Sequence, residues 1–404
     1  MLYPSLRDNI LPIQTAFLAM LWMVNSSCAQ KVDISKGYEK IDVSSFWDSS
    51  HHWYDINDDD KIITPSSDQK KYSASDVSAI ADNILLYQKT NGGWPKNYDM
   101  LAVLTDSQRR AVVASKNDIN ATTFDNGATH AQVEYLAQAY ALTGDVRYRN
   151  ACVRGIDFVL SAQYPNGGWP QFYPDTSGYR KYITFNDGAM IGVMNVLHHI
   201  LQGRSYYSFV GASKRDEVGK AFERGLDCIL KCQIEQNGQL TAWCQQHDNL
   251  DFHPEDARAF EPASICSEES AEIVLFLMGI DHPSKRVTNA IQGAVQWFEF
   301  SKIGGIRVEV VKAPLAHYKY YTTETDRVVV QDPDAPPIWT RLYELNTNRP
   351  LFCNRDRQPV YSLAEVDRER RMGYTWYNYA PAGVLKTYGS WQHKWDPDRN
   401  VLAR

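Results

Sequence analysis

The sequence has no strong excess of charge, few cysteines and no apolar run long enough to cross a membrane. Its 404 residues carry a formal net charge of −6, without the strongly basic balance typical of proteins that bind nucleic acid or anionic membranes. The apolar run at 16–24 is shorter than the roughly 20 residues that a membrane-spanning helix needs. We therefore predict neither a nucleic-acid partner nor stable membrane insertion.

Cysteine is too scarce for a disulfide scaffold. The chain contains seven cysteines, and none of them are spaced as Cys-x-x-Cys, which argues against a structural zinc site. We expect the six cysteines after residue 30 to be buried thiols, with one disulfide bond at most.

The first 29 residues have the pattern of a secretory signal peptide. Arg7 precedes the apolar run, and Ser27 and Ala29 occupy the small-residue positions of a cleavage site before Gln30. This predicts a secreted protein, extracellular or periplasmic. Anchoring as a lipoprotein at Cys28 is the less favoured alternative, because the residues before it lack the usual apolar pattern.

Residues 30–70 are polar and rich in Ser and Asp, so we interpret them as a linker or an N-terminal extension. Asp55, Asn57 and Asp59 resemble the start of an EF-hand loop, but the glycine and the final glutamate of that loop are missing. Residues 71–404 are expected to form a single catalytic domain, which we predict to be a monomer.

The motif NGGWP occurs twice, at 91–95 and 166–170, each time after an amphipathic segment with helical periodicity. A degenerate copy, QNGQLTAW, begins at Gln236, and IGGIRV at 303–308 is a candidate fourth copy. The recurrence of this motif after similar helical segments indicates a repeat architecture. Trp94 and Trp169 are expected to pack beneath a cleft, and Trp169 is also a candidate substrate contact.

A second motif lies between these copies. TTFDNGAT begins at Thr122 and ITFNDGAM at Ile183, each followed by an apolar helical pattern; RAFEPAS at Arg258 and TRLYEL at Thr340 are interpreted as the third and fourth copies. One unit therefore holds two helices. The sequence predicts an all-α protein, an (α/α) toroid or incomplete barrel of repeated helix pairs, with short β and irregular decorations such as 302–340 on the cleft side.

The turns of such a toroid meet at one end, where two kinds of side chain would converge. Asp125, Asn126 and Asp187 are hard oxygen donors of the kind that Ca²⁺ binds, and Mg²⁺ or Mn²⁺ would use similar groups. The guanidinium group of arginine can bind a carboxylate through two parallel hydrogen bonds. The candidate arginines for binding carboxylates of a ligand lie near aromatic residues and are Arg258, Arg341, Arg355, Arg370 and Arg371. Together these groups indicate an acidic polysaccharide as the ligand.

The motifs NGGWPK, TTFDNGAT, NGGWPQ, ITFNDGAM, RAFEPAS and RRMGYTWY, in this order from Tyr72 to Trp391, resemble the pectate lyases of polysaccharide lyase family ten. The resemblance implies calcium-assisted β-elimination of polygalacturonate. It also implies a role for Asp125, Asn126 and Asp187 in binding Ca²⁺, for Arg258 as the base, and for Arg341 and Arg355 in binding substrate carboxylates.

Further candidate substrate contacts are Lys96, which becomes Gln171 in the second copy, and Tyr343 in TRLYEL. Arginine is an unusual base because its pKa exceeds ~12, so we expect Ca²⁺ and neighbouring cations to lower the pKa of Arg258.

Other classes remain open at this point. Gln88-x-x-x-Gly92-x-Trp94 matches the repeat of terpene cyclases, although no Asp-rich motif lies within the repeats. An α/α-toroid glycoside hydrolase would need a carboxylate pair, which Asp125 and Asp187 could supply. A non-catalytic protein that binds surface polysaccharide would use the same aromatics and Ca²⁺ without turnover.

Overall fold

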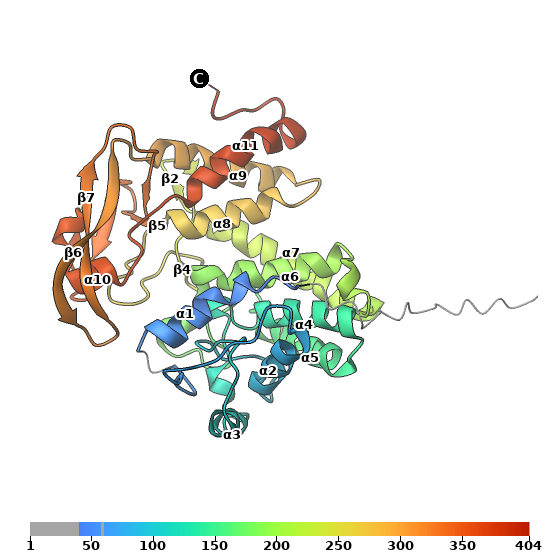
Figure 1. Cartoon of the computed structure of the whole chain (residues 1–404). Helices are drawn as coiled ribbons and strands as arrows, with labels where there is room; N and C mark the ends of the chain where they lie inside the picture. Colours follow the sequence, from blue (N-terminus) through green and yellow to red (C-terminus); the bar gives the residue numbers. More distant parts are fainter. Residues whose placement is uncertain (1–39, 58–59, 404) are drawn as a thin grey trace, which may run out of the picture. The chain divides into compact units, whose positions relative to one another are not determined.

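The computed structural model describes residues 40–57 and 60–403, and helices dominate it (Figure 1). The longer helices are α1 (Trp47–Asp55), α2 (Val77–Tyr87), α3 (Asp106–Ala114), α4 (His130–Thr143), α5 (Val146–Ala162), α6 (Ala189–Leu201), α7 (Ala212–Cys232), α8 (Ser267–Met278), α9 (Lys285–Ser301), α10 (Arg368–Met372) and α11 (Ala380–Trp395). The strands are β1 (Ile183–Thr184), β2 (Glu235–Gln236), β3 (Gln239–Leu240), β4 (Gln246–His247), β5 (Ile265–Cys266), β6 (Ile306–His317), β7 (Thr322–Gln331), β8 (Trp339–Thr340), β9 (Leu342–Tyr343), β10 (Pro350–Cys353), β11 (Pro359–Val360) and β12 (Tyr377–Asn378).

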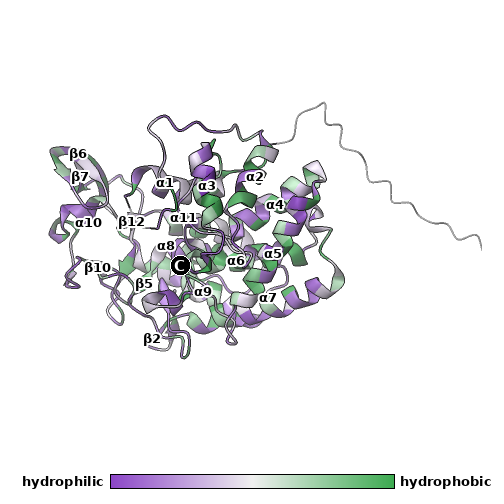
Figure 2. Ribbon diagram, turned by 90° about the horizontal axis from the view of Figure 1, so that it is seen from below, coloured by the Kyte–Doolittle hydropathy of each residue, from purple (hydrophilic) through white to green (hydrophobic). Residues whose placement is uncertain are grey.

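The helices form two series that alternate along the chain. Helices α2, α5, α7 and α9 contact one another in that order, and so do α4, α6, α8 and α11. Helix α6 is buried along most of its length and is mainly hydrophobic in Figure 2, whereas α7 carries hydrophilic residues along its outer edge. Pairs of inner and outer helices repeated in this way confirm the predicted fold class of an α/α toroid.

Each outer helix is followed by a tryptophan that fastens the returning chain to it. The indole N–H of each donates to a carbonyl of the preceding helix, at distances of 2.7 to 2.9 Å, in the pairs Trp94–Ile84, Trp169–Val159, Trp243–Ile229 and Trp339–Phe298. The fourth copy of the turn therefore ends at Trp339. The expectation that IGGIRV completes this copy is wrong, because the β6–β7 hairpin is inserted between the end of α9 and the tryptophan.

The glutamine of the turn joins one repeat to the next. Gln163 Nε2 donates to Gly167 O at 3.0 Å within its own turn and to Ala221 O of α7 at 2.8 Å. A side chain at Gly167 would meet the carbonyl of Arg224 in α7 at 2.0 Å, and its φ is +98°. The glycine is thus required for the close approach of the next outer helix.

The turns before the inner helices, which we call capped turns from the Asp and Asn that the sequence places there, show no side-chain cap hydrogen bond at the starts of α4, α6 and α8. They are aligned by their bonds to these tryptophans. The backbone N–H groups of Thr123, Thr184 and Cys266 donate to the carbonyls of Trp94, Trp169 and Trp243, respectively. The third capped turn therefore begins at Cys266, and the interpretation of RAFEPAS as the third copy is wrong. The equivalents of the DN and ND pairs in this repeat are Glu268 and Glu269, at the start of α8.

The fourth unit differs in a similar way. Thr340 pairs with Tyr377 in the two-stranded β8–β12 sheet, and the inner helix that follows is α11. TRLYEL is therefore a strand and turn beside the tryptophan, and not the capped turn that we expected. The residues between these segments supply β9, β10 and β11, which form a small sheet with β5 of the third repeat in the order β11-β10-β9-β5.

Residues 40–57 belong to the same compact unit as the repeats, so of the two interpretations, linker or N-terminal extension, this part of the chain fits an extension that packs on the domain. Trp53 of α1 is fully buried, and its Nε1 donates to Ile63 O at 2.8 Å. Ser49 Oγ donates to Tyr98 O at 2.9 Å. The ordered domain therefore starts before residue 71 and includes α1.

Some predictions concern segments that the structure does not describe. The signal peptide at 1–29 and the anchoring site Cys28 lie outside the described residues. The cysteines within the described part are Cys152, Cys228, Cys232, Cys244, Cys266 and Cys353, and all six are buried and free of disulfide bonds. Across residues 40–57 and 60–403, none of the helices has the length and apolar character needed to cross a membrane.

Candidate active site

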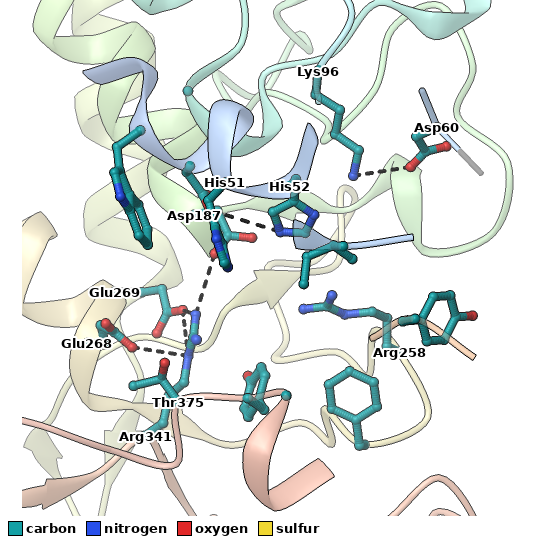
Figure 3. A pocket seen from close by; sticks show the side chains of 18 of the residues that line it. His51, His52, Asp60, Lys96, Asp187, Arg258, Glu268, Glu269, Arg341 and Thr375 are labelled. Atoms are coloured by element: carbon teal, nitrogen blue, oxygen red, sulfur yellow. Dashed lines mark hydrogen bonds and ion pairs between the residues drawn. The ribbon is translucent and has the colours of Figure 1, made fainter. Parts of the chain in front are cut away.

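A cavity of about 930 Å³ opens beside the capped turns, within the usual range for ligand sites (Figure 3). Its walls come from α1, the turn before α6, the first turns of α8, the loop at 258–260, the tip of the β6–β7 hairpin and α10. In Figure 3, Glu268, Glu269 and Arg341 lie on the left and Arg258 lies on the right. The two sides differ in charge.

The side formed by the starts of the inner helices is rich in carboxylates, and we call it the acidic side. Its members are Asp48, Asp125, Asp187, Glu268, Glu269 and Glu272. Asn126 and Asp187 occupy equivalent places in their repeats, with φ values of 51° and 50°. Asn and Asp tolerate this left-handed conformation better than other side-chain-bearing residues, which explains their presence in the two turns.

Asp125 lies at the bottom of the acidic side, 3% exposed. Lys96 Nζ donates to its Oδ2 at 2.8 Å, while its Oδ1 has no hydrogen-bond partner. Burial by itself would raise the pKa of Asp125, but the Lys96 ammonium outweighs burial and holds this pKa below its ordinary value. Asp125 is thus an ionised carboxylate with one unused oxygen.

Asp187 lines the cavity above Asp125. Burial, followed by repulsion from Asp125, raises the pKa of Asp187 well above its ordinary value. The nearest cation is Arg341, whose Nη2 lies 3.7 Å from Asp187 Oδ1. The acidic side therefore has more carboxyl groups than its own cations can pair with, which adds to burial in raising the pKa of Asp187.

Arg341 is held by protein carboxylates. Its Nε donates to Glu269 Oε1 at 3.1 Å and lies 3.4 Å from Glu268 Oε2. Gln245 Nε2 donates to Asn186 Oδ1 at 2.7 Å and to Glu269 Oε1 at 3.0 Å. Lys96, Gln171, Gln245 and Arg341 occupy the same place, two residues after the tryptophan of each repeat, and form a row along the acidic side.

The donors on the acidic side fit a hard cation such as Ca²⁺. Asp125 Oδ1, Glu268 Oε2 and Glu269 Oε2 are buried oxygens without hydrogen-bond partners, and carboxylate repulsion would be relieved by a cation. Among the described residues, however, no group of three or more His, Cys, Asp or Glu side chains is already arranged to hold a metal. Amide, substrate or water oxygens would have to complete the shell.

The opposite side is built around one aromatic ring, and we call it the basic side. The guanidinium carbons of Arg258, Arg355 and Arg370 lie 5.0, 5.2 and 4.5 Å from the centre of the Phe260 ring. Glu261 pairs with Arg258, and Glu369 pairs with both Arg355 and Arg370. Three guanidinium groups face two carboxylates, which leaves one positive charge for a ligand.

The charge state of Arg258 is governed by a neighbouring carboxylate. Desolvation in the pocket would lower the pKa of Arg258, but the Glu261 carboxylate outweighs it and raises that pKa well above its ordinary value. Arg258 Nε donates to Glu261 Oε2 at 2.6 Å. Arg258 is therefore firmly protonated in this arrangement.

Most of the residues singled out from the sequence meet at this cavity. Those that line it are Lys96, Asp187, Arg258, Arg341, Arg355 and Arg370. Asp125 and Asn126 lie directly beneath, where Asn126 Nδ2 donates to Asn97 Oδ1 at 2.8 Å. Arg371 instead pairs with Asp326, at 2.8 Å.

Trp169 and Tyr343 are not placed to contact a substrate. Each is 1% exposed. The indole N–H of Trp169 donates to the carbonyl of Val159 in α5, and Tyr343 Oη donates to Ser301 O at 2.7 Å. Their inclusion among the substrate contacts is corrected, because both side chains belong to the packing beneath the repeats.

Two groups of cavity residues were missed in the sequence. Glu268, Glu269 and Glu272 escaped notice because the third repeat was aligned at Arg258; counting from Trp243 to the next apolar helix would have found them. Trp47, Asp48, His51 and His52 line the cavity from α1 (Figure 3 labels the two histidines). The only sequence indication for them was the amphipathic pattern of a short helix.

The fold and the site define a class: a helical toroid whose cleft has acidic and basic sides suited to an anionic carbohydrate and a cation. The sequence model of the pectic acid lyase family matches residues 88–385. The chain therefore belongs to the pectic acid lyase family and is a polysaccharide lyase.

Solved structures agree with this assignment. A mutant of the Family 10 polysaccharide lyase from Cellvibrio cellulosa, in complex with trigalacturonic acid, is 31% identical with a TM-score of 0.66; the match covers 78% of this chain and 92% of that one. A second structure of the Family 10 polysaccharide lyase from Cellvibrio cellulosa is 32% identical with a TM-score of 0.66, covering 78% and 91%. None of the curated proteins matches the sequence of this chain.

Proposed function

We propose that this polysaccharide lyase is a pectate lyase that cleaves polygalacturonate by calcium-assisted β-elimination and releases oligogalacturonides with a C4=C5 double bond. The observation that carries the proposal is the division of one cavity into an acidic side with unused oxygens and a basic side with an excess guanidinium charge. The similar lyase whose structure holds trigalacturonic acid supports the same substrate class.

The two sides would have different tasks. Asp125, Asn126 and Asp187 would hold Ca²⁺, and Ca²⁺ bound there would neutralise a uronate carboxylate and so make the neighbouring C5–H more acidic. Arg355 would bind a second carboxylate of the polymer, with Arg370 held beside it by Glu369. Lys96 keeps Asp125 ionised and in position.

The elimination needs a base but no attacking water. Arg258 would accept the C5 proton; the C5–H electron pair would form the C4=C5 double bond, and the C4–O4 bond would break with its electrons leaving on O4. Because Glu261 raises the pKa of Arg258, this step requires Arg258 to leave Glu261 and lose a proton when substrate binds. We therefore expect activity to rise with pH in the alkaline range.

The reaction can be followed directly through the ultraviolet absorbance of the unsaturated product. Incubation with polygalacturonate and Ca²⁺ is expected to raise this absorbance, and a chelator is expected to abolish the rise. New reducing ends without absorbance would instead show a hydrolase, and binding without either would show a non-catalytic polysaccharide-binding protein. Either result would overturn the proposal.

Hydrolysis is not favoured by the arrangement of the two aspartates. Asp125 is 3% exposed, its Oδ2 accepts a hydrogen bond from Lys96, and it is not among the residues that line the cavity, so it is poorly placed to act as one of the two carboxyl groups that a hydrolase needs beside the sugar. The secreted location and the monomeric state stay predictions from the sequence, and they agree with a polymer substrate that is too large to enter a cell.

A further inference from the structure

Helix α1 presents an exposed aromatic surface at the rim of the cavity. Among the tryptophans that the structure describes, only Trp47 is exposed, with 66% of its surface accessible. Its ring stacks on His51 with centroids 5.1 Å apart and planes 7° apart, and both residues line the cavity. An exposed indole that stacks on a neighbouring ring at the edge of a ligand site is a candidate ligand contact, because its free face is large, flat and apolar.

The helix that carries this ring is fastened at several points. Phe46, directly before α1, is 1% exposed, and Trp53 is fully buried in the main core. A side chain at Gly127, in the DNG turn, would meet Ser45 O at 2.6 Å, so the start of α1 rests directly on the turn that contains Asp125. The indole of Trp47 is therefore held in a defined position relative to the acidic side.

The far end of α1 is joined to the hairpin on the other wall. The backbone N–H of Asn57 donates to Tyr320 O at 2.7 Å, at the tip between β6 and β7. The Tyr320 ring lies 5.2 Å from the Arg355 guanidinium and lines the cavity as well. Helix α1 and the hairpin tip thus form a continuous wall that runs from the acidic side to the basic side.

We propose that the Trp47–His51 stack is an additional sugar-binding subsite, which takes a galacturonosyl residue of the polymer beyond those held between the acidic and basic sides. The inference rests on the proposed function and extends it. An indole face stacks on the flat apolar face of a pyranose ring, and the stack with His51 presents that face at little cost in side-chain entropy. The family match begins at residue 88, so α1 lies outside the residues by which the family is recognised.

The subsite predicts that affinity depends on oligomer length. In Trp47→Ala, the KM for hexagalacturonate divided by the KM for trigalacturonate is expected to rise about tenfold relative to wild type. Trp47→Phe keeps an aromatic face and is expected to recover part of this effect. The same ratio in all three proteins would overturn the inference.

A matched control and a second readout separate this test from other outcomes. Phe300→Ala removes an aromatic side chain that is 77% exposed on α9, away from the cavity, and is expected to leave the ratio unchanged. An equal rise in KM for both oligomers, or a lowered melting temperature in Trp47→Ala, would show a structural role and overturn the subsite.

Failure of the proposed function is distinguishable from failure of the subsite. If the wild-type protein releases no unsaturated product, the proposed function fails, and the subsite is tested by calorimetric titration with the two oligomers. Weaker binding of hexagalacturonate alone in Trp47→Ala would support the subsite in that case. Equal binding by the variant and the wild type would overturn it.

Discussion

The two sides of the cavity are built on different supports. The acidic side stands on the starts of inner helices, in turns that repeat along the chain and rest on the main core. The basic side stands on a loop, a small four-stranded sheet and α10, over a separate cluster of buried residues that includes Phe260, Leu342 and Phe352. The acidic side is thus formed by turns that recur in successive repeats of the toroid. The basic side is formed by segments inserted between the repeated elements.

The sides also differ in how far their polar groups are satisfied. Each arginine of the basic side has a carboxylate partner, so its guanidinium positions are set before a ligand arrives. The acidic side keeps buried oxygens without hydrogen-bond partners, and the pKa of Asp187 is raised. The arginines of the basic side are therefore preorganised, whereas the acidic side has oxygens left over for a further partner. This is the difference expected if a cation binds only on the acidic side.

The largest effect is expected on the basic side, from Arg258. Arg258→Ala should lower kcat on polygalacturonate by on the order of 10³-fold, because the group that accepts the C5 proton is removed. Arg258→Lys keeps a positive charge and should be nearly as inactive. Initial rates of absorbance increase measure both, with Arg371→Lys, an arginine paired to Asp326 outside the cavity, as the control. Near-normal activity of Arg258→Lys would refute its role as the base.

The next effect should appear on the acidic side. Asp187→Asn keeps the shape of the side chain but removes its charge, and should weaken Ca²⁺ binding and lower activity about 100-fold at fixed Ca²⁺. Calorimetric titration with CaCl₂ checks the binding, and excess Ca²⁺ should restore part of the activity. Asp216→Asn, at an exposed aspartate of α7 that pairs with Lys220 away from the cavity, is the control. Unchanged Ca²⁺ affinity in Asp187→Asn would show that Asp187 does not bind the cation, and the assignment of cation binding to the acidic side would then fail.

A smaller effect is expected from Arg355. Because Arg355 would bind a carboxylate similarly in the ground state and the transition state, Arg355→Ala should raise KM about tenfold with a lesser change in kcat. Steady-state kinetics on polygalacturonate measure this split. A fall in kcat as large as that of Arg258→Ala would mean that Arg355 acts in the chemical step.

The smallest effect should be on stability, through Glu272. Burial, followed by repulsion from Glu269 and Glu268, raises the pKa of Glu272 to about 7. Because this pKa lies above its ordinary value, protonated Glu272 stabilises the fold; this contribution is complete below about pH 4.5 and is lost as pH rises to about 7. The Glu272 side chain is exposed where it lines the cavity, so solvent screens much of the effect.

In Glu272→Gln, the decline in the free energy of unfolding between these pH values should be shallower than in the wild type when both are measured in chelator. Urea denaturation at several pH values provides the measurement. Added Ca²⁺ should reduce the difference between the two proteins, because a cation bound on the acidic side offsets the same repulsion. An identical pH dependence in the two proteins would show that the pKa of Glu272 is not raised by the neighbouring carboxylates of the acidic side.

Much of the site could be predicted from local sequence. Asp125, Asn126 and Asp187 were found because the two turns share their flanking residues, and Arg258 and Arg355 were found through motifs of the family. The third repeat was misaligned because its carboxylates are glutamates at the start of α8, without the Phe and Gly-Ala that mark the first two. Phe260 also lies at about the spacing from Phe185 at which the next copy of the motif was expected, so it was taken as the equivalent phenylalanine.

The helix pairs, the tryptophan turns and the carboxylates of the first two repeats follow from local sequence, because helix periodicity and turn chemistry are local properties of a chain. Which charged groups meet depends instead on how distant segments pack. Lys96 faces Asp125 and Arg341 faces Glu269, 72 residues away, because successive repeats pack side by side. The same packing brought α1 to the rim of the cavity and paired Arg258 with Glu261, which raises the pKa of Arg258.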